Sequence, residues 1–188
     1  MKFDDDRLIY LDLEFISRKY EAHFGQDPAT KITKQEGCTA GLKALFATAG
    51  ISTQESRTYS VTSRQMLHNL WAHLIKTYPL FENFQNYQGT KLVWMQGELT
   101  LAEWTPSGSK RKGFEFFQLN SGVQRTAFLA DKSYFSAGFA EVFDASMALK
   151  GNIGIPVYCL ARVMWNVEAA MNYVACPYII TERIESHV

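Results

Sequence analysis

Two carboxylates near the start of the chain have the spacing of a metal-binding pair. Asp12 and Glu14 lie in the short apolar run of residues 8–16, which we predict to be a strand that continues as a short helical piece to Phe24. Residues i and i+2 of a strand share one face, so both carboxylates could bind one divalent cation and support hydrolysis. On an amphipathic strand, the same two residues would instead form part of the solvated face.

An apolar strand that ends in Asp-x-Glu resembles the metal-binding opening of the DEDD exonucleases. This resemblance implies metal-dependent phosphodiester hydrolysis with Asp12 and Glu14 as the weak catalytic candidates. The rest of the pattern is missing, because Phe15 replaces the glycine that commonly follows. Neither Asp131 nor Asp144 has a Tyr or His before it at the required spacing. A metal-dependent nuclease is therefore the second alternative.

A basic turn between two strands is the next candidate. Residues 92–104 and 114–119 read as a hairpin, and its tip carries Lys110, Arg111 and Lys112. Basic side chains bind the phosphates of single-stranded nucleic acid without reading its sequence. This turn predicts a nucleic-acid or nucleotide site, and a merely soluble turn is the competing interpretation.

Aromatic residues flank this basic turn, and we expect Trp94 and Trp104 to supply rings that stack on a ligand. Alternate residues of a strand face opposite sides, so at most half of the rings in this region can be outside the core. Gly97 interrupts the first strand and indicates a bulge or a close approach of another backbone.

The cysteines and histidines predict no metal or cofactor site. Cys38, Cys159 and Cys176 lack the spacing of metal ligands, and no glycine-rich phosphate motif is present. His68 and His73 are five residues apart on a predicted helix, so they diverge by roughly 140° about its axis and we expect both at the surface. His23 and His187 are isolated in the sequence.

Among the elements that would position these groups, the clearest is an amphipathic helix at about residues 62–78. Thr62 and Gln65 form a capping box and Pro79 ends the helix. One apolar face follows the helical period at Met66, Leu67, Leu70, Trp71, Leu74, Ile75 and Tyr78.

Elsewhere the pattern mixes strands and helices without strict alternation. Residues 134–149 are typical of a helix, residues 178–184 of a short strand, and residues 155–174 fit a helix or a strand equally well. We therefore predict an α+β fold with an antiparallel sheet packed against the helix at 62–78 and one or two further helices. A Gly/Ser/Thr-rich excursion at about 26–56 interrupts a single domain that spans residues 1–188.

Composition limits the partners. Basic and acidic residues number 19 each, which excludes a uniformly basic surface but not a local basic patch. The acidic start, the sparse cysteines and the lack of a long apolar run predict a cytoplasmic protein that does not enter a membrane.

The order of short motifs resembles that of bacterial proteins that carry only a domain-of-unknown-function label. Residues 9–12 (Ile-Tyr-Leu-Asp) open the chain, a Gly/Ser/Thr-rich stretch follows, and residues 58–62 lead into the predicted helix. The likeness covers about residues 1–80 and implies a bacterial accessory protein of a mobile-element or phage-defence locus.

No complete catalytic constellation is present, and aromatic residues make up 14% of the chain. Aromatic residues are enriched in interface cores, so we predict a non-enzymatic binding or regulatory protein that acts through a protein partner or through self-association. A well-packed core is the other explanation of the same surplus. Nucleic-acid or nucleotide binding by the basic hairpin is the first alternative.

Overall fold

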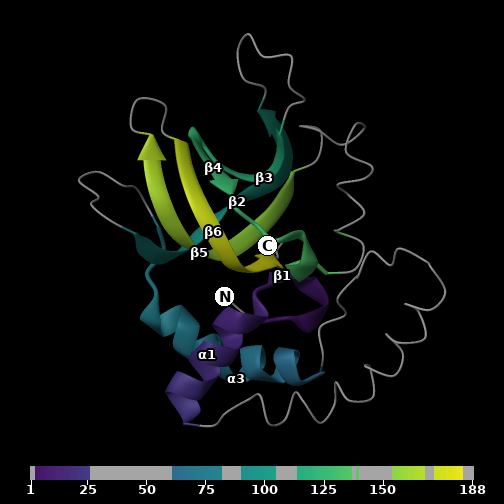
Figure 1. The fold of residues 1–188 in the computed structure, drawn as a ribbon, viewed down its shortest axis with the longest axis vertical. Coiled ribbons are helices and arrows are strands. Elements are labelled where there is room, and N and C mark those ends of the chain that lie inside the picture. Colours follow the sequence, from purple (N-terminus) through teal and green to yellow (C-terminus); the bar gives the residue numbers. More distant parts are fainter. Residues whose placement is uncertain are drawn as a thin grey trace, which may run out of the picture.

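The structure is a computed structural model that describes residues 3–25, 61–81, 90–104, 114–136, 139, 154–167 and 172–183. These residues form two α-helices and six strands, together with short 3-10 turns (Figure 1). The predicted α+β class is confirmed. None of the helices that the structure describes has the length and hydrophobicity needed to cross a membrane.

Five strands close into a barrel. They are β2 (Lys91–Trp104), β3 (Phe114–Ser121), β4 (Gln124–Phe128), β5 (Ile155–Val167) and β6 (Asn172–Glu182). Their order is β2-β3-β4-β6-β5, and pairing between β5 and β2 closes the ring. All these pairs are antiparallel except β4 with β6, which is parallel. The prediction of an antiparallel sheet therefore needs correction, because the strands form a mixed and closed barrel.

The long strand β2 pairs with two neighbouring strands, one after the other. Its first part pairs with β5 from Lys91 to Leu99, and its second part pairs with β3 from Glu98 to Trp104. The strand changes partner near Gly97, where a Cβ atom would collide with the backbone carbonyl of Asn120 on β3. The predicted close approach at this glycine is confirmed, and it lets β2 bend around the barrel.

Outside the barrel, β1 (Leu8–Leu11) pairs with the second half of β6, and α1 (Leu13–Phe24) follows at once. The predicted strand over residues 8–16 is too long, because the chain turns into a helix after Asp12. Gly25 ends α1 with a φ of 64°, a left-handed conformation that glycine adopts without strain.

The predicted helix at 62–78 is confirmed as α3 (Val61–Thr77), which begins one residue before the expected cap. Its apolar stripe includes Met66, Leu67, Leu70 and Leu74, all of which are buried. The helical period thus places one face of α3 against the strands and the other in solvent.

Two apolar cores lie on the two sides of the barrel wall. The barrel core fills the interior with residues such as Leu99, Leu119 and Val157. The helix core lies between the outer wall and the helices, and it contains Leu160 and Ile179. Figure 1 shows α1 and α3 lying together beside the strands of this half of the barrel.

The ambiguous segment at residues 155–174 is a strand in its described part, because β5 extends from Ile155 to Val167. The predicted strand at 178–184 belongs to β6, which begins earlier, at Asn172. The excursion at 26–56 lies outside the described residues, as does most of the helix predicted at 134–149.

Candidate ligand-binding face

The two helices that the structure describes, α1 and α3, pack against one side of the barrel. The helix core takes residues from β1, β5, β6 and the first half of β2, but none from β3 or β4. The outer surface of the second half of β2 and of β3 and β4 is therefore free of the helix core. We call this surface the β2-β3-β4 face.

Strand alternation decides which side chains point out from this face. Leu99 and Leu101 on β2, like Phe117 and Leu119 on β3, are buried in the barrel core. Successive side chains alternate between the two faces of a strand, so the residues between these positions point outward. This rule identifies which polar residues lie on the outer surface of the face.

The register aligns the outward residues in rows across the three strands. Thr100 on β2 lies opposite Gln118 on β3, and Asn120 on β3 lies between Glu98 on β2 and Arg125 on β4. The tight turn at Gly122, with a φ of 61°, joins β3 to β4 and holds these rows close together.

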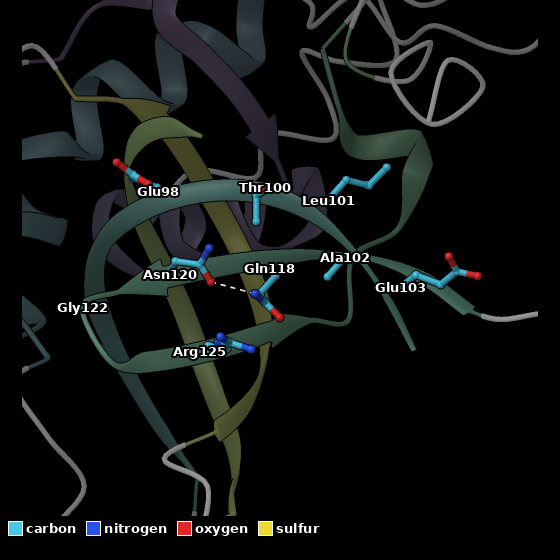
Figure 2. Close-up of a pocket in the computed structure, with 9 residues that line it drawn as sticks. All are labelled: Glu98, Thr100, Leu101, Ala102, Glu103, Gln118, Asn120, Gly122 and Arg125. Carbon is cyan, nitrogen blue, oxygen red and sulfur yellow. Dashed lines mark hydrogen bonds between the residues drawn. The ribbon is translucent and has the colours of Figure 1, made fainter. Parts of the chain in front are cut away.

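The rows line a shallow groove with a volume of about 660 Å³. Its lining, which we call the polar groove, consists of Glu98, Thr100, Leu101, Ala102, Glu103, Gln118, Asn120, Gly122 and Arg125. In Figure 2, Thr100, Ala102 and Gln118 occupy the middle of the groove, with Glu98 and Glu103 toward opposite ends.

Two amides of the groove hold each other in place. Gln118 Nε2 donates a hydrogen bond to Asn120 Oδ1 at 2.7 Å, drawn as the dashed line in Figure 2. This bond leaves the Gln118 carbonyl oxygen as an acceptor and the Asn120 amide group as a donor. The pair therefore presents fixed polar atoms of both kinds to the groove.

Thr100 adds a polar atom that lacks a partner. Its Oγ1 is buried, and the described residues provide no hydrogen-bond partner for it. Buried hydroxyl groups in proteins are almost always hydrogen-bonded to protein, water or ligand. A water molecule or a polar ligand atom in the groove would satisfy this hydroxyl.

The charges of the polar groove are divided between its two sides. Glu98 and Glu103 are exposed on β2, whereas Arg125 is exposed on β4. Within the described part of the chain, Arg125 takes part in no salt bridge. An anionic group would therefore bind on the β4 side of the groove.

The predicted basic tip connects two strands of this same face. β2 ends at Trp104 and β3 begins at Phe114, and these two residues are register partners. The segment with Lys110, Arg111 and Lys112 joins them and lies outside the described residues. The predicted hairpin is confirmed, and its strands are β2 and β3.

The two tryptophans predicted to contact a ligand have different outcomes. Trp94 is buried in the helix core with 2% exposure, its Nε1 donates to the Leu74 carbonyl at 3.2 Å, and its ring meets that of Trp71 edge to face. The prediction for Trp94 was therefore wrong. The side chain of Trp104 lies outside the described residues.

The carboxylates predicted as a metal pair do not share a strand. Asp12 is the N-cap of α1, where its Oδ1 accepts a hydrogen bond from the Phe15 amide at 2.8 Å, and Glu14 lies exposed in the first turn. The metal site and the solvated face were both predicted on the assumption that Asp12 and Glu14 lie on one strand. That assumption was wrong, because Asp12 caps α1 and Glu14 lies within it. Burial raises the pKa of Asp12, an effect that the hydrogen bond from Phe15 opposes.

The described residues contain no group of three or more His, Cys, Asp or Glu side chains arranged to hold a metal ion. Cys159 is buried in the barrel core, where burial raises the pKa of its thiol well above the usual range. Cys176 is half-buried, and burial raises its pKa as well. Raised pKa values disfavour the thiolate, which is the nucleophilic form.

Histidines that are distant in sequence meet in the fold. The rings of His23 on α1 and His73 on α3 have centroids 4.0 Å apart. His23 was predicted to be isolated, but in the fold it contacts another histidine. Sequence spacing gave no signal for this contact, because it depends on the packing of α1 against α3.

The chain matches no protein-family model, and no curated protein has significant similarity to it. The resemblance to bacterial proteins with a domain-of-unknown-function label therefore stays a prediction.

Proposed function

We propose that this protein is a non-enzymatic binding protein that holds single-stranded nucleic acid on the β2-β3-β4 face. The observation that carries the proposal is the polar groove on β2, β3 and β4, because the segment with the basic tip connects two of these strands in the sequence. Among the described residues, the helix core occupies the other half of the barrel wall and does not cover this face.

The barrel topology supports the choice of face. The five-stranded barrel resembles the five-stranded Greek-key barrel of OB-folds. OB-folds bind oligonucleotides and oligosaccharides on their second and third strands and through the loop between the first and second. Here those elements are β3, β4 and the loop of the basic tip.

Charge and hydrogen bonding favour a nucleic acid over a neutral ligand. Lys110, Arg111 and Lys112 supply three cations in the segment that connects β2 to β3, and Arg125 adds a fourth on β4. Cations attract phosphates, and the fixed amides of the groove suit the polar edges of unpaired bases. Because Glu98 and other carboxylates on β2 repel phosphates, we expect the nucleic-acid backbone to follow the β4 side.

The proposal is tested by binding of a fluorescently labelled single-stranded oligonucleotide, followed by fluorescence anisotropy over a series of salt concentrations. Changing Lys110, Arg111 and Lys112 together to Ala removes up to three phosphate contacts. The slope of log affinity against log salt should become shallower by about 2, since each contact to a single strand contributes about 0.7.

A matched control removes three positive charges from the helices, by changing Arg18, Lys19 and Lys76 to Ala. This control should retain most of the wild-type salt slope. Absence of binding by the wild type at low salt would overturn the proposal. An equal effect of both triple variants would overturn the assignment to the basic tip.

A second candidate function is the one predicted from composition, binding of a protein partner or a second copy of the chain. The observation that favours it is a hollow lined by residues of β3 and of the end of β4, which we call the apolar end. Leu129 is 56% exposed there, beside the half-buried Phe116, in a second hollow that also includes Phe117 and Phe128. Exposed apolar side chains that adjoin one another are typical of interaction sites.

Native mass spectrometry separates the two candidates. If the apolar end is an interface between copies, the wild type should form a dimer that the Leu129→Lys variant does not form. A monomer at all concentrations for both proteins would exclude self-association. Under either function, we assign the protein to the cytoplasm and to an accessory role in a bacterial mobile-element or defence locus, following the sequence resemblance.

A further inference from the structure

A pair of histidines joins the two helices at the end of α1. The rings of His23, in the last turn of α1, and His73, on α3, have centroids 4.0 Å apart and planes inclined by 35°. Thr77 Oγ1 lies 3.3 Å from His73 Nε2, within hydrogen-bond distance. Two neutral rings pack favourably at this separation, whereas two charged rings repel each other.

The groups around this pair are basic. Lys19 on α1 and Lys76 on α3 both act on His73 by charge, as does His23. Within the described residues, no carboxylate contributes to this environment. Burial, followed by these three basic neighbours, lowers the pKa of His73.

We propose that His23 and His73 form a pH-sensitive contact, which joins the ends of α1 and α3 when the rings are neutral and weakens when both are protonated. This inference is independent of the nucleic-acid proposal, because neither residue belongs to the β2-β3-β4 face.

The sign of the pH dependence follows from proton binding. His73 binds a proton less tightly in the folded protein than in the unfolded chain, so the unfolded chain binds more protons as the pH falls. The stability from this contact is therefore fully present above about pH 6.5 and is lost as the pH falls through the lowered pKa. Repulsion of two unit charges at 4 Å in water corresponds to a roughly fivefold change in an equilibrium constant.

The position of the pair decides which part of the helix should respond. The start of α1 is fixed to the barrel, because the Asp12 amide donates to the Tyr178 carbonyl at 2.8 Å and the Phe15 ring stacks on that of Tyr178 at 4.1 Å. His23 lies in the last turn of α1, at the other end of the helix from this fixed start. We expect acid to loosen the last turn of α1 before it affects the start.

Hydrogen exchange followed by NMR tests the inference, at about pH 5.5 and about pH 7.5, after correction for intrinsic exchange rates. EDTA is included to exclude metal binding. The opening equilibrium of residues 20–24 should be roughly fivefold more favourable at the lower pH in the wild type. In His73→Gln and in His23→Gln, this pH dependence should largely disappear.

His68→Gln is the matched control, since His68 lies on the same helix and is exposed. It should keep the wild-type pH dependence. A merely structural role of His73 would raise opening equally at both pH values in His73→Gln. That result, or the full wild-type pH dependence in either variant of the pair, would overturn the inference.

Discussion

At the first turn of α1, a carboxylate of the chain itself satisfies a backbone amide. The first amides of a helix have no partner within the helix, and Asp12 accepts a bond from one of them, that of Phe15. Removing this cap in Asp12→Ala should lower the free energy of unfolding by about 1 kcal/mol. At acidic pH, Asp12→Asn should remain close to the wild type, because an amide oxygen accepts the same bond. Urea denaturation followed by circular dichroism measures both.

The pH dependence of Asp12 adds a second readout. Burial raises the pKa of Asp12 in the folded protein, so the folded state holds this proton more tightly than the unfolded chain. The stability from Asp12 is therefore largest at acidic pH and falls as the pH rises through the raised pKa. Asp12→Asn lacks this titration. Its free energy of unfolding should therefore increase relative to that of the wild type between acidic and neutral pH. A difference in the free energy of unfolding between the two proteins that does not change with pH would contradict this pH dependence of Asp12.

Gly97 has a steric role at the bend of β2. A Cβ atom there would collide with the Asn120 carbonyl, which is part of a strand and is not free to move away. We expect Gly97→Ala to destabilise the fold by about 1–3 kcal/mol. Gly154→Ala is the control, because its Cβ would meet only the flexible end of Glu98 at 3.0 Å. Equal midpoints of thermal unfolding for the two variants would disprove this steric role.

At the scale of elements, α3 holds the helix core together. Leu70 is fully buried at the middle of its apolar face, whereas the neighbouring Asn69 is exposed. Leu70→Ala should cost about 2–5 kcal/mol, since it removes buried methyl groups and leaves a cavity. Asn69→Ala should change stability by less than about 0.5 kcal/mol. A small loss in Leu70→Ala, measured by urea denaturation, would mean that α3 contributes little to the fold.

The elements with one buried face were predictable from the sequence. α3 shows a helical period, and β2 and β3 flank an evident turn, so their types and approximate ends follow from local pattern. β5 was ambiguous for a physical reason. Val157 and Ala161 enter the barrel core while Leu160 enters the helix core, so the strand is apolar on both faces and its period is hidden.

The candidate site was only partly predictable. Strand alternation limits the number of outward rings, but it does not tell which side of β2 faces solvent at Trp94. The answer depends on α3 covering that part of the strand, which is a long-range contact. Gln118 lies in the strand predicted over residues 114–119 and Asn120 directly follows it, so the alternation of polar residues there was a usable signal.

At the scale of the molecule, the two cores give the barrel two different sides. One side is covered by α1 and α3, and the other presents the polar groove. Closure of the barrel also depends on the parallel pairing of β4 with β6, which joins segments far apart in the sequence. Local pattern contains no information on such a pairing, so the closed barrel was not predicted.

The division into two sides leads to the central claim, that the β2-β3-β4 face binds single-stranded nucleic acid. The most direct test is a titration of the ¹⁵N-labelled protein with an unlabelled single-stranded oligonucleotide at low salt, followed by two-dimensional NMR. We predict saturable shifts of the backbone amides of Thr100, Gln118, Asn120 and Arg125, with little change in α1 and α3. Shifts confined to the helices, or no shifts at all, would contradict the account.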